Sequence, residues 1–143
     1  MPRQKHDLRV FLDANVLFSA AYREEAGLSV LWKLSGVHLI TSLYAAQEAA
    51  NNHAIDVQQS RLRHLPEDVE IVAGEAVMSI EVQALLAKVL LPDKDRPILA
   101  AAVAAGADVL LTGDIQHFGI YFNRSVCGLR ILRPAEFLRS FAE

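Results

Sequence analysis

Short apolar runs alternate with longer, periodic apolar stretches along this 143-residue chain. A short run that is rich in Val, Ile and Leu and ends in polar residues or glycine predicts a buried strand. Apolar positions three and four residues apart predict a helix. The predicted strands span residues 8–12, 37–41, 69–73, 108–111 and 130–132. The predicted helices span residues 16–21, 28–35, 43–53, 75–91, 97–105 and 134–141, with a further helix to about residue 64.

Glycine and proline mark several of the predicted boundaries. Gly36 and Gly106 follow helical stretches, Pro92 ends one, and Pro97 suits the first turn of the next. Strands that alternate with helices predict a mostly parallel sheet with helices on both faces. The length is that of one domain, so we expect residues 1–143 to form a single domain.

The composition indicates a soluble globular protein. Hydrophobic residues make up 52% of the chain and charged residues 22%, and the single Cys127 excludes an internal disulfide. No apolar run is long enough to span a bilayer, and the first residues lack the apolar segment of a secretory signal. We therefore expect a cytoplasmic protein without a membrane partner. A net charge of −3 argues against a broad basic face for nucleic acid but does not exclude a nuclease.

Four acidic residues occupy positions where chemistry is expected. Asp13 and Asp114 each follow an apolar strand, and sites in parallel sheets form beyond the carboxyl ends of the strands. Asp95 precedes the helix that begins near Pro97, and Glu48 is the acidic residue of the helix after the second strand. Each has an ordinary structural explanation as a helix cap, a turn residue or a solvated side chain. Together, however, Asp13 and Asp114 point to one edge of the sheet.

Such a cluster of carboxylates needs a counter-charge. Two unit charges about 4 Å apart repel by roughly 4 kcal/mol at an effective dielectric constant of 20. Protonation or a cation can relieve this repulsion. Oxygen ligands without cysteine or clustered histidine favour Mg²⁺ or Mn²⁺. These ions suit phosphate chemistry, in which they activate water and neutralise the leaving oxygen.

The sequence resembles the PIN-domain family of small metal-dependent ribonucleases, which includes many toxins of bacterial toxin–antitoxin pairs. The resemblance lies in an Asp-x-Asn after the first strand, a mid-chain Glu, an Asp before an Ala-rich helix, and a Thr-Gly-Asp after a later strand. The last part of the chain also resembles the end of one PIN subgroup assigned to toxin components. The matching segments are residues 10–17, Glu48, and residues 91–102, 108–114 and 128–138.

This resemblance implies a three-layer α/β/α sandwich and a metal-dependent endoribonuclease that hydrolyses RNA phosphodiester bonds as the toxin of such a pair. It also implies an antitoxin protein as a partner, and, because PIN proteins often pair, a homodimer. By the resemblance, the catalytic acids that bind Mg²⁺ or Mn²⁺ would be Asp13, Glu48, Asp95 and Asp114.

Three further residues have a role implied by the same resemblance. Asn15 and Thr112 would orient the acids or the substrate. Asp93 could replace or assist Asp95, and we prefer Asp95 because it lies immediately before the helix of Pro97.

The sequence departs from the family pattern at two places. Ala14 stands where a Thr is common, which weakens the ordering of the first turn. The residues after Asp114 lack the basic residue that is often found there. His117 in this segment could approach the substrate, but we prefer to interpret it as a surface histidine.

Two other functions fit parts of the pattern. A phosphatase of the haloacid dehalogenase type would use Asp13 as its nucleophile, but it needs a second acid where Asn15 stands, and no clear phosphate-binding lysine follows a strand. The other alternative is a PIN-like module that binds RNA or a protein without cleavage. All four acids are present, which favours catalysis over this second alternative.

Overall fold

The computed structural model describes residues 7–22, 27–51, 69–72 and 80–142 of the chain. Six strands within this part form one sheet in the order β3-β2-β1-β4-β6-β5. The strands are β1 (Leu8–Leu12), β2 (Val37–Ser42), β3 (Glu70–Val72), β4 (Val109–Leu111), β5 (Arg124–Val126) and β6 (Leu129–Leu132).

The central strand β1 pairs in parallel with both β2 and β4. Its register places Phe11 beside Ile40 on one side and Leu12 beside Leu111 on the other. All the other pairings in the described sheet are parallel except β5 with β6, which is antiparallel. The carboxyl ends of β1 and β4 therefore lie side by side.

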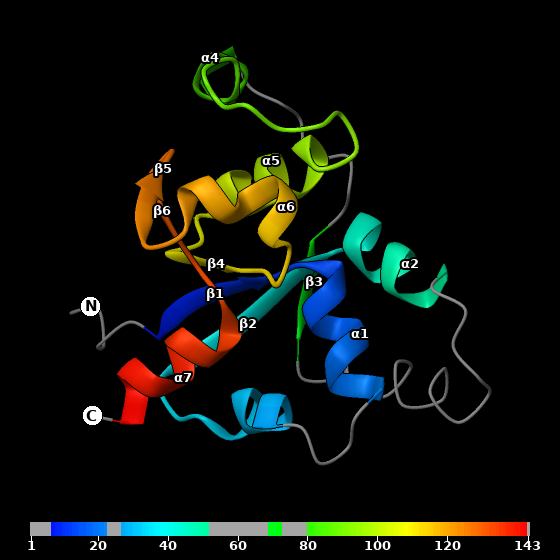
Figure 1. Cartoon of the computed structure of the whole chain (residues 1–143), viewed down its shortest axis with the longest axis vertical. Helices are drawn as coiled ribbons and strands as arrows, with labels where there is room; N and C mark the ends of the chain where they lie inside the picture. Colours follow the sequence, from blue (N-terminus) through cyan, green and yellow to red (C-terminus); the bar gives the residue numbers. More distant parts are fainter. Residues whose placement is uncertain (1–6, 23–26, 52–68, 73–79, 143) are drawn as a thin grey trace, which may run out of the picture.

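Helices cover both faces of this sheet (Figure 1). One face carries α5 and α6, and the opposite face carries α1, η1 and α7. This confirms the predicted three-layer α/β/α arrangement with a mostly parallel sheet. The helices are α1 (Ala14–Tyr22), η1 (Gly27–Lys33), α2 (Leu43–Asn51), α4 (Ile80–Leu86), α5 (Arg96–Ala104), α6 (Ile115–Phe118), η3 (Gly119–Tyr121) and α7 (Pro134–Ala142), of which η1 and η3 are 3₁₀ helices.

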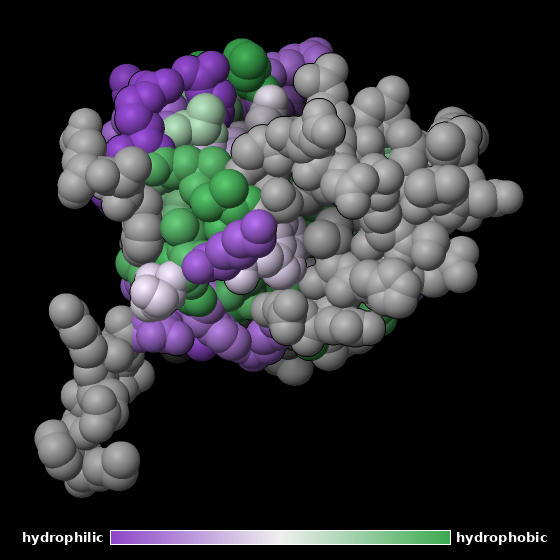
Figure 2. Space-filling view, turned by 90° about the horizontal axis from the view of Figure 1, so that it is seen from below, coloured by the Kyte–Doolittle hydropathy of each residue, from purple (hydrophilic) through white to green (hydrophobic). Residues whose placement is uncertain are grey.

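The core lies along the middle strands and α5. Phe11, Leu110 and Ile131 are fully buried, as are Ile98 and Leu99 of α5. Strands that are covered on both faces have near-continuous apolar sequences, which explains why β1 and β4 were readable from the sequence. In Figure 2 the underside of the molecule, formed by α7 and η1 in Figure 1, shows apolar side chains between hydrophilic ones.

Two predicted elements differ from the structure. The sequence predicts a helix over residues 75–91. Among the described residues of this range, α4 covers Ile80–Leu86 and ends at Leu86. Its end is fixed by Arg96, whose guanidinium donates to the carbonyl oxygens of Leu86 (2.8 Å) and Val89 (3.1 Å). The stretch 28–35 forms the 3₁₀ helix η1 rather than an α-helix.

Other predictions have simpler outcomes. The sequence did not predict β5. The further helix to residue 64 lies outside the described residues. None of the described helices is both long enough and apolar enough to cross a membrane.

Candidate metal centre

Asp13 occupies the turn directly after β1 and is 5% exposed. Because Leu12 pairs with Leu111, Asp13 lies beside Thr112 at the end of β4. Its Oδ2 accepts hydrogen bonds from Thr112 Oγ1 (2.8 Å) and Asn15 Nδ2 (3.3 Å). Its Oδ1 accepts from the backbone N–H of Ala14 (2.6 Å). The parallel pairing of β1 with β4 thus positions this carboxylate, and three donors orient it.

Asn15 and Thr112 join the turn after β1 to the turn after β4. Asn15 Oδ1 accepts from the backbone N–H of Gly113 (2.8 Å), and Asn15 Nδ2 donates to Thr112 Oγ1 (3.3 Å). Thr112 is fully buried, and its Oγ1 also accepts from the backbone N–H of Asp114 (3.1 Å). The Asp-x-Asn and Thr-Gly-Asp segments, which lie almost a hundred residues apart in the chain, therefore form one hydrogen-bonded unit.

Asp95 is also 5% exposed and lies at the N-cap position of α5. Its side chain makes no capping hydrogen bond to that helix within the described structure, so the ordinary explanation as a helix cap does not apply. Its Oδ1 lies 3.5 Å from Lys94 Nζ. Its Oδ2 is buried and accepts no hydrogen bond from any residue that the structure describes.

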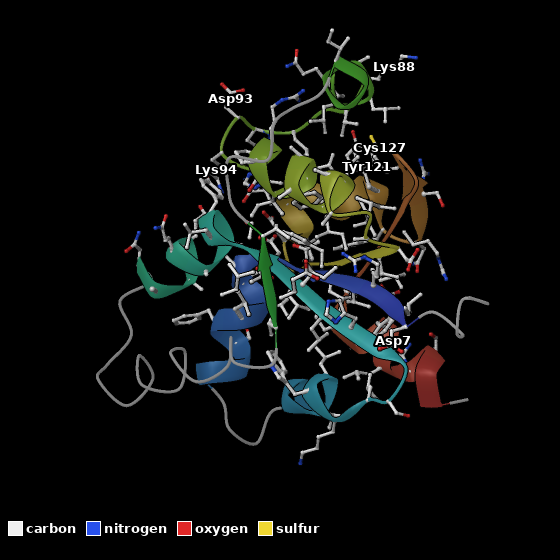
Figure 3. All side chains as sticks on the ribbon, turned by 180° about the vertical axis from the view of Figure 1, so that it is seen from behind. Asp7, Lys88, Asp93, Lys94, Tyr121 and Cys127 are labelled. Carbon is white, nitrogen blue, oxygen red and sulfur yellow. The ribbon has the colours of Figure 1, made fainter. Side chains whose placement is uncertain are left out.

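Asp93 lies apart from this group because its side chain is exposed. Figure 3 shows Asp93 at the outer edge of the loop before α5, with Lys94 nearer to α2. Of the two acids left open by the sequence, Asp95 is the buried one that faces the other acids.

Asp114 follows β4 and does cap the short helix α6. Its Oδ1 accepts from the backbone N–H of His117 (3.0 Å), and its Oδ2 lies 2.8 Å from His117 Nδ1 in hydrogen-bond geometry. The same Nδ1 is 2.9 Å from Asp95 Oδ2. This second pair is a close contact without hydrogen-bond geometry.

The expectation that His117 is a surface histidine is therefore wrong. Its side chain is 21% exposed and lies between two carboxylates. A signal was available in the sequence, since a residue three positions after a helix-capping Asp lies next to that Asp in the first turn.

Glu48 reaches the site from α2 and is partly exposed. Tyr44, one turn earlier in α2, donates a hydrogen bond from its hydroxyl to the backbone oxygen of Lys94 (2.7 Å). This bond ties α2 to the loop that carries Asp95. Sequence reasoning gave no role to Tyr44 or Lys94, because the contact joins residues fifty positions apart and has no local pattern.

Burial and mutual repulsion shape the ionisation of these acids. Burial raises the pKa of Asp13 from 3.8 to about 6, and although hydrogen bonds from Thr112 and Ala14 lower it, the charges of Asp95 and Glu48 raise it again. Burial also raises the pKa of Glu48, which Lys94 lowers and Asp95 raises. The charge of Asp95 therefore acts on both Asp13 and Glu48, and the charge of Glu48 acts on Asp13.

The residues present fit a divalent cation. One carboxylate oxygen of Asp95 is buried without a donor, which is costly unless a positive charge is nearby. Ligand atoms of Asp95, Asp114 and His117 all lie within 4.8 Å of one another. Asp13 and Glu48 add negative charge beside Asp95. Oxygen-rich clusters of this kind are typical of metal sites that act on phosphates.

No protein-family model matches the sequence, and no curated protein does either. Solved structures match the fold. A chain of VapBC2 from Rickettsia felis, solved bound to promoter DNA, has a TM-score of 0.64 at 18% identity over 88% of this chain and 98% of that one. A toxin–antitoxin complex from Klebsiella pneumoniae gives 0.64 at 19% identity over 87% and 97%. VapC20 from Mycobacterium tuberculosis, a sarcin–ricin-loop-cleaving toxin, gives 0.53 at 13% identity over 73% and 91%.

These likenesses define the class of fold. The chain has the PIN-domain fold, a mostly parallel α/β/α sandwich with acidic residues at the carboxyl edge of its sheet. More particularly, it has the fold of the VapC-type toxins among these structures. At identities below 20% the likeness concerns the fold and not the function.

Proposed function

We propose that this chain is a divalent-metal-dependent endoribonuclease that hydrolyses RNA phosphodiester bonds and serves as the toxin of a toxin–antitoxin pair. The observation that carries the proposal is the buried Asp95 oxygen without a hydrogen-bond donor, surrounded by Asp13, Glu48 and Asp114. Among the described residues, the positive groups close to these acids are Lys94 and, when it is protonated, His117, so the four carboxylates are left with negative charge that a divalent cation would balance.

Each residue has a defined part in the proposed reaction. The acids Asp13, Glu48, Asp95 and Asp114 would hold Mg²⁺ or Mn²⁺. When bound, such an ion supplies positive charge to a phosphodiester and lowers the pKa of water.

The surrounding polar residues keep these acids in place. Thr112 and Asn15 fix the position of Asp13 through hydrogen bonds at 2.8 and 3.3 Å. Lys94, whose side chain is 61% exposed, offers a positive charge at the edge of the site, where it can contact a phosphate of the substrate.

The fold neighbours support the biological part of the proposal. VapC20 is a toxin that cleaves the sarcin–ricin loop, and two other neighbours are a VapBC complex and a toxin–antitoxin complex. By analogy, we propose RNA as the substrate, an antitoxin protein as a partner, and a homodimer as a further assembly. We also propose that residues 1–143 act as a single domain in the cytoplasm.

Cleavage of a fluorophore-quencher RNA in the presence of Mg²⁺ or Mn²⁺ tests this function. Asp95→Asn and Asp13→Asn should each lower the rate by about 100-fold or more, the loss typical of removing an electrostatic group from a reaction centre. Asp7→Asn is the matched control, because Asp7 is exposed and precedes β1 at the opposite edge of the sheet from the site (Figure 3).

Two outcomes would contradict the proposal. Cleavage by Asp95→Asn and Asp13→Asn at the rate of the parent protein would remove these acids from the reaction. Release of inorganic phosphate from small phosphomonoesters, without RNA cleavage, would indicate a phosphatase instead.

A further inference from the structure

His117 is the residue in the site whose chemistry differs from that of the acids. Its Nδ1 lies 2.8 Å from Asp114 Oδ2 and 2.9 Å from Asp95 Oδ2. The ring is about four-fifths covered, and the backbone N–H of His117 donates to Asp114 Oδ1 (3.0 Å). The backbone of His117 is thus held next to Asp114 by α6, and its ring nitrogen contacts both carboxylates.

We propose that His117 is a nitrogen ligand of the divalent cation, together with Asp95 and Asp114, and that it makes the site select Mn²⁺ or Co²⁺ over Mg²⁺. This inference rests on the metal site of the proposed function and narrows the choice of ion there.

The spacing of the three side chains is that of ligands around one ion. An ion that binds oxygen and nitrogen at about 2.1 Å holds neighbouring ligand atoms about 3.0 Å apart in octahedral geometry. The two contacts of the His117 nitrogen, at 2.8 and 2.9 Å, match this edge length. The ligand atoms of the whole group lie within 4.8 Å of one another.

A simple ion pair does not account for the arrangement. The imidazole nitrogen has hydrogen-bond geometry toward Asp114 only, which leaves Asp95 Oδ2 buried and without a donor among the described residues. Asp95 is 5% exposed, so water has little access to that oxygen. One cation in contact with all three side chains would give Asp95 Oδ2 a positively charged partner. A hydrogen bond from the imidazole ring reaches Asp114 Oδ2 only.

The donor set determines which ions are favoured. Mg²⁺ prefers oxygen ligands and water, and it gains little from imidazole. Affinity for mixed nitrogen and oxygen sites rises from Mn²⁺ to Co²⁺ along the first transition row. A site with His117 as a ligand should therefore prefer these ions, while the carboxylates alone would also accept Mg²⁺.

Binding of Mn²⁺, Co²⁺ and Mg²⁺ to the full chain by calorimetry, without RNA, tests the inference. His117→Gln keeps a polar side chain of similar length but removes the imidazole. We expect it to weaken Co²⁺ and Mn²⁺ binding by about 10-fold or more and Mg²⁺ binding by less than about 3-fold. His38→Gln is the matched control, since His38 is paired with Glu70 on β2 and β3.

Pulsed electron paramagnetic resonance of Mn²⁺ bound to the unmodified protein gives a second readout that does not depend on a variant. A coupling to a directly bound ¹⁴N is expected, and it should disappear in His117→Gln. Absence of that coupling, or an equal loss of affinity for all three ions in His117→Gln, would overturn the inference and leave the proposed nuclease intact. Failure of the unmodified protein to bind any of the ions would overturn both proposals.

Discussion

Replacing Asp13 by Asn should stabilise the metal-free protein at neutral pH. The pKa of Asp13 is about 6 in the folded protein against an ordinary 3.8, and burial is the main cause. A carboxyl group with a raised pKa in the folded state disfavours folding once it is ionised. The native state binds more protons than the unfolded state between these two values, so stability falls as the pH rises through this window and stays low above it.

The magnitude follows from the size of this shift. About two pKa units correspond to about 3 kcal/mol of unfavourable free energy when Asp13 is fully ionised. Asn carries no charge and avoids this cost. In the parent protein, however, the hydroxyl of Thr112 and the side-chain amide of Asn15 donate to Asp13, and the Nδ2 of the introduced Asn cannot accept these hydrogen bonds. Each lost hydrogen bond costs about 1 kcal/mol. We expect a net gain of about 1–2 kcal/mol at pH 7.5.

Urea unfolding of both proteins in a chelator, at pH 7.5 and pH 4.5, measures this effect. The difference in unfolding free energy between variant and parent should shrink by about 2 kcal/mol at the lower pH, because Asp13 is then mostly protonated in the folded parent. Asp7→Asn, which replaces an exposed carboxylate outside the site, is the control for removal of one negative charge. If the variant were less stable than the parent by the same amount at both pH values, ionisation of Asp13 would not destabilise the folded state.

Three further substitutions test local features by urea unfolding. Thr112→Val should destabilise by about 1–3 kcal/mol at pH 7.5, because the buried hydroxyl donates to Asp13 and accepts from the backbone, and a gain in stability would refute this role. Ser42→Ala should cost about 1 kcal/mol, since Ser42 Oγ accepts from the backbone N–H of Ala45 as the cap of α2, and an unchanged midpoint would contradict it. Cys127→Asn should add about 0.5–1 kcal/mol, because φ is 53° there and Asn tolerates this conformation better, so a loss of stability would argue against turn strain.

The sheet and its acidic edge could be predicted because their signals are local. Strands β1 and β4 are buried on both faces, so their sequences are almost continuously apolar and end abruptly at Asp13 and Thr112. In a parallel sheet such ends meet at one edge, which brings the two segments together without further information. Gly106, with φ of 68°, ended α5 where the sequence predicted the end of that helix.

The features that were missed depend on contacts between distant residues or on unusual turns. The turn between β5 and β6 is Cys127-Gly128, with φ of 53° and 83°, whereas the sequence signal for this turn is Asn-Gly. The end of α4 depends on Arg96, because its guanidinium donates to backbone carbonyl oxygens that would accept intrahelical hydrogen bonds in a longer helix. His117 of α6 approaches Asp95 at the N-cap of α5 through a tertiary contact, and no spacing in the sequence encodes that approach.

Asp95 shows most clearly that the site costs the fold stability. An Asp at the N-cap of a helix normally bonds to the first backbone N–H groups and contributes about 1 kcal/mol. Asp95 has this position in α5 but makes no capping bond in the described structure, and its charge instead raises the pKa of Asp13 and Glu48. The side chain therefore forgoes a stabilising interaction and adds a repulsive one. A cation that binds only the folded protein would reverse this balance, with about 2.7 kcal/mol gained at 100 times its dissociation constant. The same orientation that weakens the metal-free fold is thus what makes the fold responsive to a metal ion.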